Sequence, residues 1–223
     1  MELQEIIDWF KSNYNQKNIE GMRRFGIVTD KAFGISSKQL DDLRKVVGTN
    51  HEIAIKLWET GYHETKMLAA LIADPKLVSP QLMDKWVLDF DNWAICDSVC
   101  GKLFRKTSYV YDKIDQWAER EELYVKRAAF ALIAWIAVHH KKQPDDFFLH
   151  YYDLIITHSK DERDHIKKAV NWALRQIGKR SRALGLEALE ICELLHREFS
   201  ESRSAKWIAS DAKRELKAKY GII

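Results

Sequence analysis

Three short segments of this sequence carry residue types that could do chemistry: Asn92–Asp97, Val125–Ala129 and Lys167–Arg175. Each is predicted to be helical. Each has a tryptophan, an acid or a basic residue where a helix normally carries either core or solvated surface. Two tryptophans, one carboxylate and several cations on three similar helices predict one shared surface with a function.

The first segment pairs an aromatic ring with a carboxylate. Trp93 and Asp97 are four residues apart, so both side chains project from the same side of one helix. Such a pair suits the stabilisation of a cation, because the indole offers a negative face and the carboxylate a full charge. A buried tryptophan beside a solvated aspartate would show the same spacing, so the spacing leaves both interpretations open.

The third segment begins a strongly basic region. Trp172 lies three residues before Arg175, and a core aromatic is again the alternative interpretation. The basic residues that we assign to this surface are Arg127, Lys167, Lys168, Arg175, Lys179, Arg180 and Arg182. No acid occurs from 166 to 182, which favours a phosphate-binding surface over an ordinary solvated face. Contacts of this kind position a duplex but read no base sequence.

Motifs for other chemistry are missing. Cys96 and Cys100 lie one helical turn apart, but no further Cys pair or His-x-x-x-His motif completes a metal site, so we expect core packing. No Gly-rich phosphate loop and no Gly-x-Ser-x-Gly motif appears, which weighs against a nucleotide-dependent enzyme and a serine hydrolase. We therefore expect no metal and no cofactor.

Composition indicates a helical globular protein. Hydrophobic residues make up 46% and charged residues 31%, and the 9 glycines and 3 prolines are few for a turn-rich β fold. The net charge of +3 permits nucleic-acid binding without requiring it. The three cysteines fit a reducing cytoplasm, and we expect a cytoplasmic protein that associates with the nucleoid when bound to DNA. Neither a signal peptide nor a membrane-spanning segment is predicted.

Apolar residues recur every three or four positions along nearly the whole chain, which predicts successive helices. The predicted helices of the later chain cover 80–89, 92–105, 108–118, 122–139, 145–157, 162–178, 183–198 and 203–219. Helices beginning near Tyr124, His165 and Ser204 resemble one another at intervals of roughly 40 residues, the period of HEAT repeats. We predict an all-α fold, a curved superhelix of HEAT-like antiparallel helix pairs, forming one domain over 1–223.

The three segments resemble the DNA alkylation repair family of AlkD-like DNA glycosylases. The resemblance rests on Asn92-Trp93 with Asp97, on Lys126–Ala129, on Ala169–Arg180 and on Ala205–Ala212, and it covers roughly residues 15 to 216. It implies a C-shaped stack of HEAT-like pairs with duplex DNA in a concave basic face. It also implies release of purines alkylated at N3 or N7, without a pocket that encloses a flipped base, unlike most glycosylases.

The resemblance also implies roles for individual residues. It makes Asp97 the catalytic carboxylate, Trp93 and Trp172 the cleft tryptophans and Arg127 a phosphate contact. With the basic series, the predicted DNA-binding residues are Arg127, Arg175, Lys168, Lys179, Arg180 and Phe25. Two positions depart from the family pattern: Ala94 stands where the family often has an acid, and Phe25 where active members have a tyrosine.

The first hypothesis is a monofunctional glycosylase that hydrolyses the N-glycosidic bond of cationic N3- or N7-alkylpurines in duplex DNA. The carboxylate would stabilise the oxocarbenium-like deoxyribose. The second hypothesis is a non-catalytic binder of damaged, bent or branched DNA that uses the same face. A protein-interaction solenoid, the usual role of HEAT arrays, is the third. In each case a monomer suffices.

Overall fold

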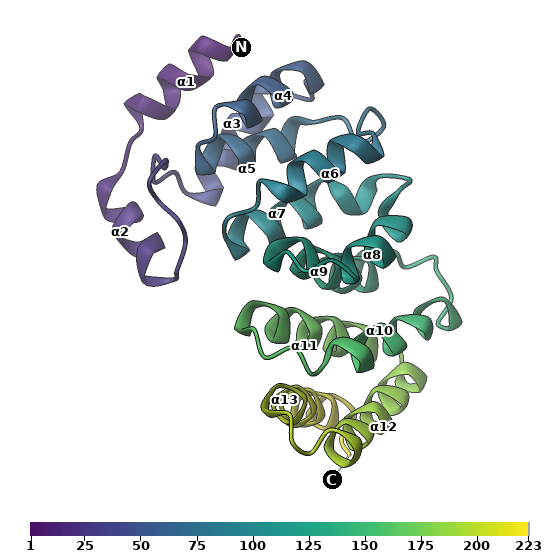
Figure 1. The fold of residues 1–223 in the computed structure, drawn as a ribbon. Coiled ribbons are helices and arrows are strands. Elements are labelled where there is room, and N and C mark those ends of the chain that lie inside the picture. Colours follow the sequence, from purple (N-terminus) through teal and green to yellow (C-terminus); the bar gives the residue numbers. More distant parts are fainter. Residues whose placement is uncertain (223) are drawn as a thin grey trace. The chain divides into compact units, whose positions relative to one another are not determined.

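The computed structural model describes residues 1–222, and in this range it contains thirteen α-helices, two short 3₁₀ helices and no β-strand (Figure 1). The predicted all-α class is therefore confirmed. The helices form two compact units, Met1–Val110 and the residues from Tyr111 onward. The single domain over 1–223 and the curvature of the array stay predictions, and Ile223 lies outside the described residues.

The first unit holds the helices that carry the Trp93–Asp97 pair. They are α1 (Leu3–Ser12), α2 (Gln16–Arg24), α3 (Ser37–Val47), α4 (His51–Glu59), α5 (His63–Ile72), α6 (Pro80–Leu88), α7 (Trp93–Lys102) and the 3₁₀ helix η1 (Phe104–Lys106). Two of these helices begin at clear capping residues. Ser36 and Gln39 form a capping box on α3, and Ser79 caps α6 with Pro80 at its first position.

Helix α5 is central to this unit. It packs against α3, α4 and α7, and Leu68, Ala69 and Ile72 are fully buried. Stacked rings strengthen the core beside it, because the Trp58 and Trp86 ring centroids lie 4.0 Å apart in nearly parallel planes. The position of α7, and with it of Trp93 and Asp97, is fixed by this packing.

The second unit holds the three similar helices that the sequence singled out. Its elements are α8 (Val110–Ala118, which begins at the unit boundary), α9 (Leu123–His139), the 3₁₀ helix η2 (Asp146–Phe148), α10 (His150–His158), α11 (Asp164–Gly178), α12 (Arg182–Glu198) and α13 (Arg203–Tyr220). Helix α11 packs against α9 and α13, and α12 packs against both α11 and α13. The helices predicted to repeat are therefore neighbours in space.

Hydrogen bonds between consecutive repeats follow the predicted period. Asn171 Nδ2 donates to Asp211 Oδ2 at 2.7 Å, across 40 residues of sequence. Arg163 bonds to the Glu121 carbonyl across 42 residues, and Tyr220 Oη donates to the Gly178 carbonyl across 42. These bonds join equivalent positions of adjacent helix pairs, as expected for HEAT-like stacking.

Several element boundaries differ from the prediction. The segment predicted as one helix over 92–105 is α-helical only to Lys102, and the 3₁₀ helix η1 follows it. The segment predicted as one helix over 145–157 is likewise divided into η2 and α10. Helix α2 was not predicted, because Ile19 is its one buried residue and no apolar periodicity marks it. Within residues 1–222, no helix combines the length and apolar character needed to cross a membrane.

Candidate nucleic-acid interface

Asn92 fixes the start of α7 and so the direction of Trp93 and Asp97. Its side chain is fully buried, and its Oδ1 accepts hydrogen bonds from the backbone N–H groups of Ala94 and Ile95 at 3.0 and 3.1 Å. An asparagine cap of this kind satisfies donors that the first turn of a helix leaves without partners. Trp93 and Asp97 are both half-buried on this helix, one turn apart as predicted.

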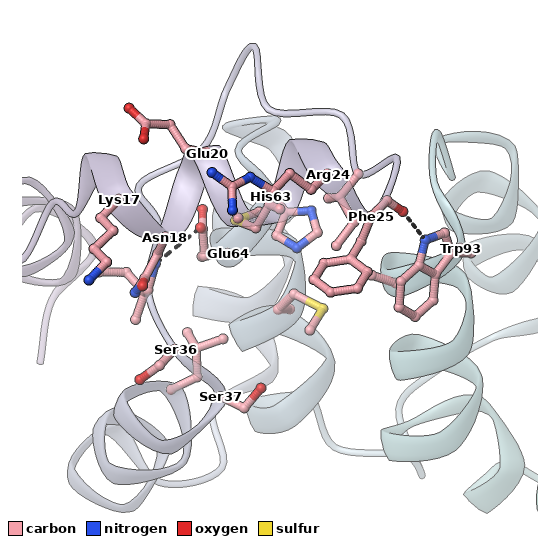
Figure 2. Close-up of a pocket in the computed structure, with 17 residues that line it drawn as sticks. Lys17, Asn18, Glu20, Arg24, Phe25, Ser36, Ser37, His63, Glu64 and Trp93 are labelled. Atoms are coloured by element: carbon pink, nitrogen blue, oxygen red, sulfur yellow. Dashed lines mark hydrogen bonds between the residues drawn. The ribbon is translucent and has the colours of Figure 1, made fainter.

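Phe25 lies beside Trp93. The indole Nε1 of Trp93 donates a hydrogen bond of 2.9 Å to the carbonyl oxygen of Phe25, which follows the last residue of α2 (Figure 2). This bond spans 68 residues of sequence, and it anchors the turn after α2 to α7. The Phe25 ring is 72% exposed, so it presents an aromatic surface to whatever binds next to Trp93.

A pocket of about 750 Å³ opens at this contact. Its residues come from α2, the following loop, α3, α5 and the start of α7. Apolar side chains cover most of the wall, and they are Met22, Phe25, Ile27, Ile35, Leu40, Met67, Trp93 and Ala94. The volume falls within the range of small-molecule sites in proteins. The pocket lies wholly within the first unit.

Glu64 holds the loop that forms one side of this pocket. Its carboxylate is 1% exposed and accepts backbone N–H bonds from Phe33 at 2.8 Å, Gly34 at 2.7 Å and Ile35 at 3.2 Å. These donors compensate for the loss of water around a buried carboxylate. Gly34 has φ +74°, and a Cβ there would lie 2.1 Å from the Asn15 carbonyl oxygen, so this crossing requires glycine.

A group of cations follows the Trp93–Asp97 pair at the end of α7. Lys102 and Lys106 are exposed, and Arg105 Nε donates to the Gly101 carbonyl at 2.6 Å. Partial burial of its amine lowers the pKa of Lys106, and the charges of Arg105, Lys102 and Arg44 lower it further. Cations that repel one another in this way favour an anion, so the cluster is suited to a phosphate backbone.

In the second unit, Arg127 lies mainly inside the protein. It is 6% exposed on α9, and its Nη1 donates a bond of 2.7 Å to the His165 carbonyl in the first turn of α11. The residue therefore joins two consecutive repeats. Its predicted contact with phosphate stays a prediction.

Trp172 is half-buried on α11 and is part of an aromatic cluster. Its ring meets that of Trp135 edge-to-face, with centroids 5.5 Å apart, and Trp135 stacks on His139. Trp172 Nε1 also lies 3.2 Å from the Gln176 side-chain oxygen when that amide is oriented to accept from Trp172 and Lys179. The predicted cleft role of Trp172 is untested by these contacts.

Two basic residues at the end of α11 form ion pairs with acidic residues that lie far away in the sequence. Arg175 forms an ion pair with Glu215, and Lys179 Nζ lies 2.6 Å from the same carboxylate. Asp211 adds a second acid, 3.8 Å from Arg175 Nε. The segment 166–182 contains no acid, but α13 supplies two. The absence of acids from 166 to 182 therefore does not leave these cations without acidic partners, and their contacts with DNA stay predictions.

Arg180 and Lys168 have different environments. Arg180 donates to the carbonyls of Ala137 at 2.6 Å and Gln143 at 2.9 Å, and its guanidinium lies 4.0 Å from the Phe148 ring centre. These contacts hold the turn after α9 in place, so the Arg180 guanidinium already has partners other than phosphate. Lys168 is exposed on α11 and takes part in no ion pair within residues 1–222. Their DNA contacts stay predictions.

Three residues near the predicted site residues were not singled out from the sequence. They are His63, Glu64 and Trp135. Glu64 meets Gly34 across 30 residues and His63 meets Asn92 across 29, contacts that no local pattern marks. Trp135 could have been found, because it follows Arg127 by about two turns on one continuous helix. Among residues 1–222, no group of three or more His, Cys, Asp or Glu side chains is placed to hold a metal ion.

Burial and neighbouring charges together determine the charge of Glu215 and His63. Burial alone would raise the pKa of Glu215, but hydrogen bonds and charge from Lys179 and Arg175 lower it below its ordinary value. The carboxylate is therefore ionised at neutral pH. Burial lowers the pKa of His63, so its imidazole is neutral there.

Comparisons with known proteins agree with this fold. A solved structure has a TM-score of 0.76 at 19% sequence identity, covering 86% of this chain and 83% of its own. That structure is described as coming from a new family of proteins related to the HEAT-like repeat DNA glycosylases, with affinity for branched DNA structures. The likeness shows the HEAT-like fold. A search of proteins of curated function finds no match.

The family profile described as "DNA alkylation repair enzyme" matches residues 6–216, which is nearly the whole sequence. The chain therefore belongs to the DNA alkylation repair enzyme family.

Proposed function

We propose that this protein is a DNA glycosylase that releases purines carrying a positive charge from alkylation at N3 or N7. The observation that carries the proposal is the pair of Trp93 and Asp97 on one face of α7, in a member of the DNA alkylation repair family. The exposed Phe25 ring and the cations at the end of α7 supply contacts for a base and for phosphates beside that pair.

The reaction breaks one bond and forms another. As the bond between C1′ and the purine nitrogen breaks, its electron pair moves to the base and neutralises the positive charge, so no acid has to protonate the leaving group. The deoxyribose becomes oxocarbenium-like, and the Asp97 carboxylate stabilises that charge. Water then forms the new bond to C1′ and loses a proton to solvent. The rings of Trp93 and Phe25 would hold the sugar and base by face contacts.

Release of free base from duplex DNA containing N7-methylguanine tests this proposal. We expect release by the wild-type protein and a loss of about 100- to 1000-fold with Asp97→Asn, the usual effect of removing one electrostatic stabiliser. Asp153→Asn is the matched control, because it makes the same change on an exposed position of α10 in the other unit. Equal rates for the two variants, or an intact substrate after prolonged incubation with wild type, would refute catalysis by Asp97.

A non-catalytic DNA binder is the second candidate. It is favoured by the structural likeness to a protein from a family described as having affinity for branched DNA, and by Phe25, which has no hydroxyl to donate. Salt-sensitive binding to a branched duplex with no base release would support this function over the first.

A further inference from the structure

A separate pocket lies at the end of α9, and the function proposed above makes no use of it. Its volume is about 450 Å³, and it lies wholly within the second unit. Its lining residues are Tyr111, His139, His140, Lys141, Lys142 and Gln143. Rings that can stack on bases, beside lysines that can meet phosphates, are the combination that binds nucleic-acid strands. We name it the α9-end pocket.

A hydrogen-bond network fixes one wall of the α9-end pocket. Gln143 Nε2 donates to Tyr111 Oη at 3.0 Å, so the single Tyr111 proton goes to His140 Nδ1, which lies 2.9 Å away. In the neutral His140 ring the proton then lies on Nε2. The Phe147 ring meets Tyr111 edge-to-face, with centroids 5.0 Å apart, and holds it from another side. The wall is therefore formed before a ligand arrives, as is usual for binding sites.

Lys141 and Lys142 give this turn its positive charge. Both are exposed, and no acid occurs between Glu122 and Asp145 in the sequence. Unlike the cations that Glu215 pairs, these two lysines take part in no ion pair within residues 1–222. A phosphate at this turn therefore has no carboxylate to displace from them.

A row of rings leads from Trp172 to the α9-end pocket. Trp172 meets Trp135 edge-to-face with centroids 5.5 Å apart, and Trp135 stacks on His139 at 5.4 Å. Trp135 and His139 are four residues apart on α9, so they project from one side of that helix, and His139 lines the pocket. The row spans at most about three charge spacings of one DNA strand. It is long enough to accompany a strand over several nucleotides.

We propose that this row and the α9-end pocket bind a single-stranded arm of DNA that leaves the duplex near Trp172. The unpaired bases would stack along Trp135 and His139, and Lys141 and Lys142 would neutralise the phosphates between them. A single strand fits this surface better than a duplex, because paired bases inside a duplex do not expose their faces to protein rings. The inference rests on DNA binding, which both candidate functions share, and not on base release.

Duplexes with and without an arm test this inference. The full-length protein would be titrated, by fluorescence anisotropy, with a blunt duplex and with the same duplex carrying an unpaired deoxyadenosine arm of about six nucleotides. We expect the arm to strengthen binding at least about fivefold, the effect of one stacked base. An abasic arm of equal length keeps the phosphates but has no bases, and it should lose most of this gain.

A matched pair of histidine variants locates the stacking surface. His139→Leu removes an exposed ring and should weaken binding of the armed duplex about fivefold or more, while binding of the blunt duplex stays unchanged. His150→Leu removes an exposed imidazole from α10 in the same unit and should change neither. Circular dichroism of both variants checks that the fold is retained.

The two lysines are tested by salt dependence. Each phosphate of a single strand contributes about −0.7 to the slope of log K against log salt, so Lys141→Ala/Lys142→Ala should reduce the magnitude for the armed duplex by about 1.4. Lys76→Ala/Lys160→Ala removes the same charge at two exposed lysines elsewhere and should leave the slope unchanged.

Several outcomes would overturn the single-strand inference. They are equal binding of blunt and armed duplexes, an abasic arm that binds as tightly as the normal arm, and a His139→Leu variant that binds the armed duplex like wild type. Preserved arm binding without base release would overturn the proposed glycosylase alone. Base release by a protein that is indifferent to the arm would overturn this inference alone.

Discussion

The side chains of Arg175 and Lys179 at the end of α11 are paired with an acid on α13, which lies about one repeat further along the chain. Glu215 on α13 forms ion pairs with both cations, and its side chain is only about one-third exposed. A phosphate that contacts these cations must therefore compete with a carboxylate already in place. The net attraction of this surface for DNA is smaller than the run of basic residues indicates.

This arrangement predicts that Glu215→Gln strengthens DNA binding. Removing the negative charge leaves Arg175 and Lys179 to attract phosphate, and we expect affinity for a short duplex to rise about two- to fivefold at low salt. Fluorescence anisotropy with a labelled duplex measures the change. Glu190→Gln makes the same substitution at an exposed position of α12 and serves as the control. Equal affinities for the two variants would show that α11 lies outside the DNA-binding surface.

Residue-scale geometry was predictable from the sequence only where it depends on helical spacing. The shared face of Trp93 and Asp97 follows from their separation of four residues, and the structure places both on α7. The bond from Trp93 to Phe25 spans 68 residues and the one from Arg175 to Glu215 spans 40, so neither was predictable. Long-range contacts of this kind depend on how helices stack.

At the scale of elements, the loop between α2 and α3 depends on the backbone conformation of one residue, Gly34. Residues 33–35 donate three N–H bonds to Glu64, and the Asn15 N–H donates to the Phe33 carbonyl at 2.8 Å. Gly34 lies at the centre of this crossing. The loop, the start of α2 and the start of α5 are thereby held together beside the pocket.

We therefore predict that Gly34→Ala destabilises the protein by about 1–3 kcal/mol. The added Cβ would overlap the Asn15 carbonyl oxygen, and the positive φ is unfavourable for alanine. Gly21→Ala is the control: Gly21 lies within α2 with nothing within 4 Å of an added Cβ, so alanine there should be neutral or stabilise by up to about 1 kcal/mol. Urea unfolding monitored by circular dichroism measures both. Equal stability of the two variants would contradict the packing described at Gly34.

Helices with a clear cap or a long apolar run were predictable: α3 and α6 begin at capping serines, and α9 is buried along most of its length. Helix α2 was missed because it buries little apolar surface of its own and is held by the loop and by Asn15, whose side chain caps it. Its C-terminal residue is followed directly by Phe25. A part of the candidate site thus depends on an element that tertiary contacts stabilise more than its own sequence does.

At the scale of the whole molecule, charge is nearly balanced. The chain has 36 Lys and Arg residues against 33 Asp and Glu residues, so long-range attraction to DNA is weak and binding must depend on local clusters. Of the cations assigned above to the predicted basic surface or to the end of α7, four are exposed and take part in no ion pair within residues 1–222. They are Lys102, Lys106, Lys168 and Arg182.

The number of such cations predicts how DNA binding responds to salt. Release of counterions from about four phosphates gives a slope of about −3.6 for log K against log salt, whereas the five basic residues predicted from the sequence would give about −4.5. Lys168→Ala should reduce the magnitude of the slope by about 1. Lys76→Ala, an exposed lysine between α5 and α6, should not change it.

Titrations of one duplex at several salt concentrations measure these slopes. A wild-type slope steeper than about −5 would mean that Arg175 and Lys179 exchange Glu215 for phosphate when DNA binds, because the exposed cations alone cannot account for it. Unchanged slopes in Lys168→Ala would place the duplex away from α11. A slope near zero would contradict DNA binding altogether and leave protein interaction, the common role of HEAT-like arrays, as the function to test.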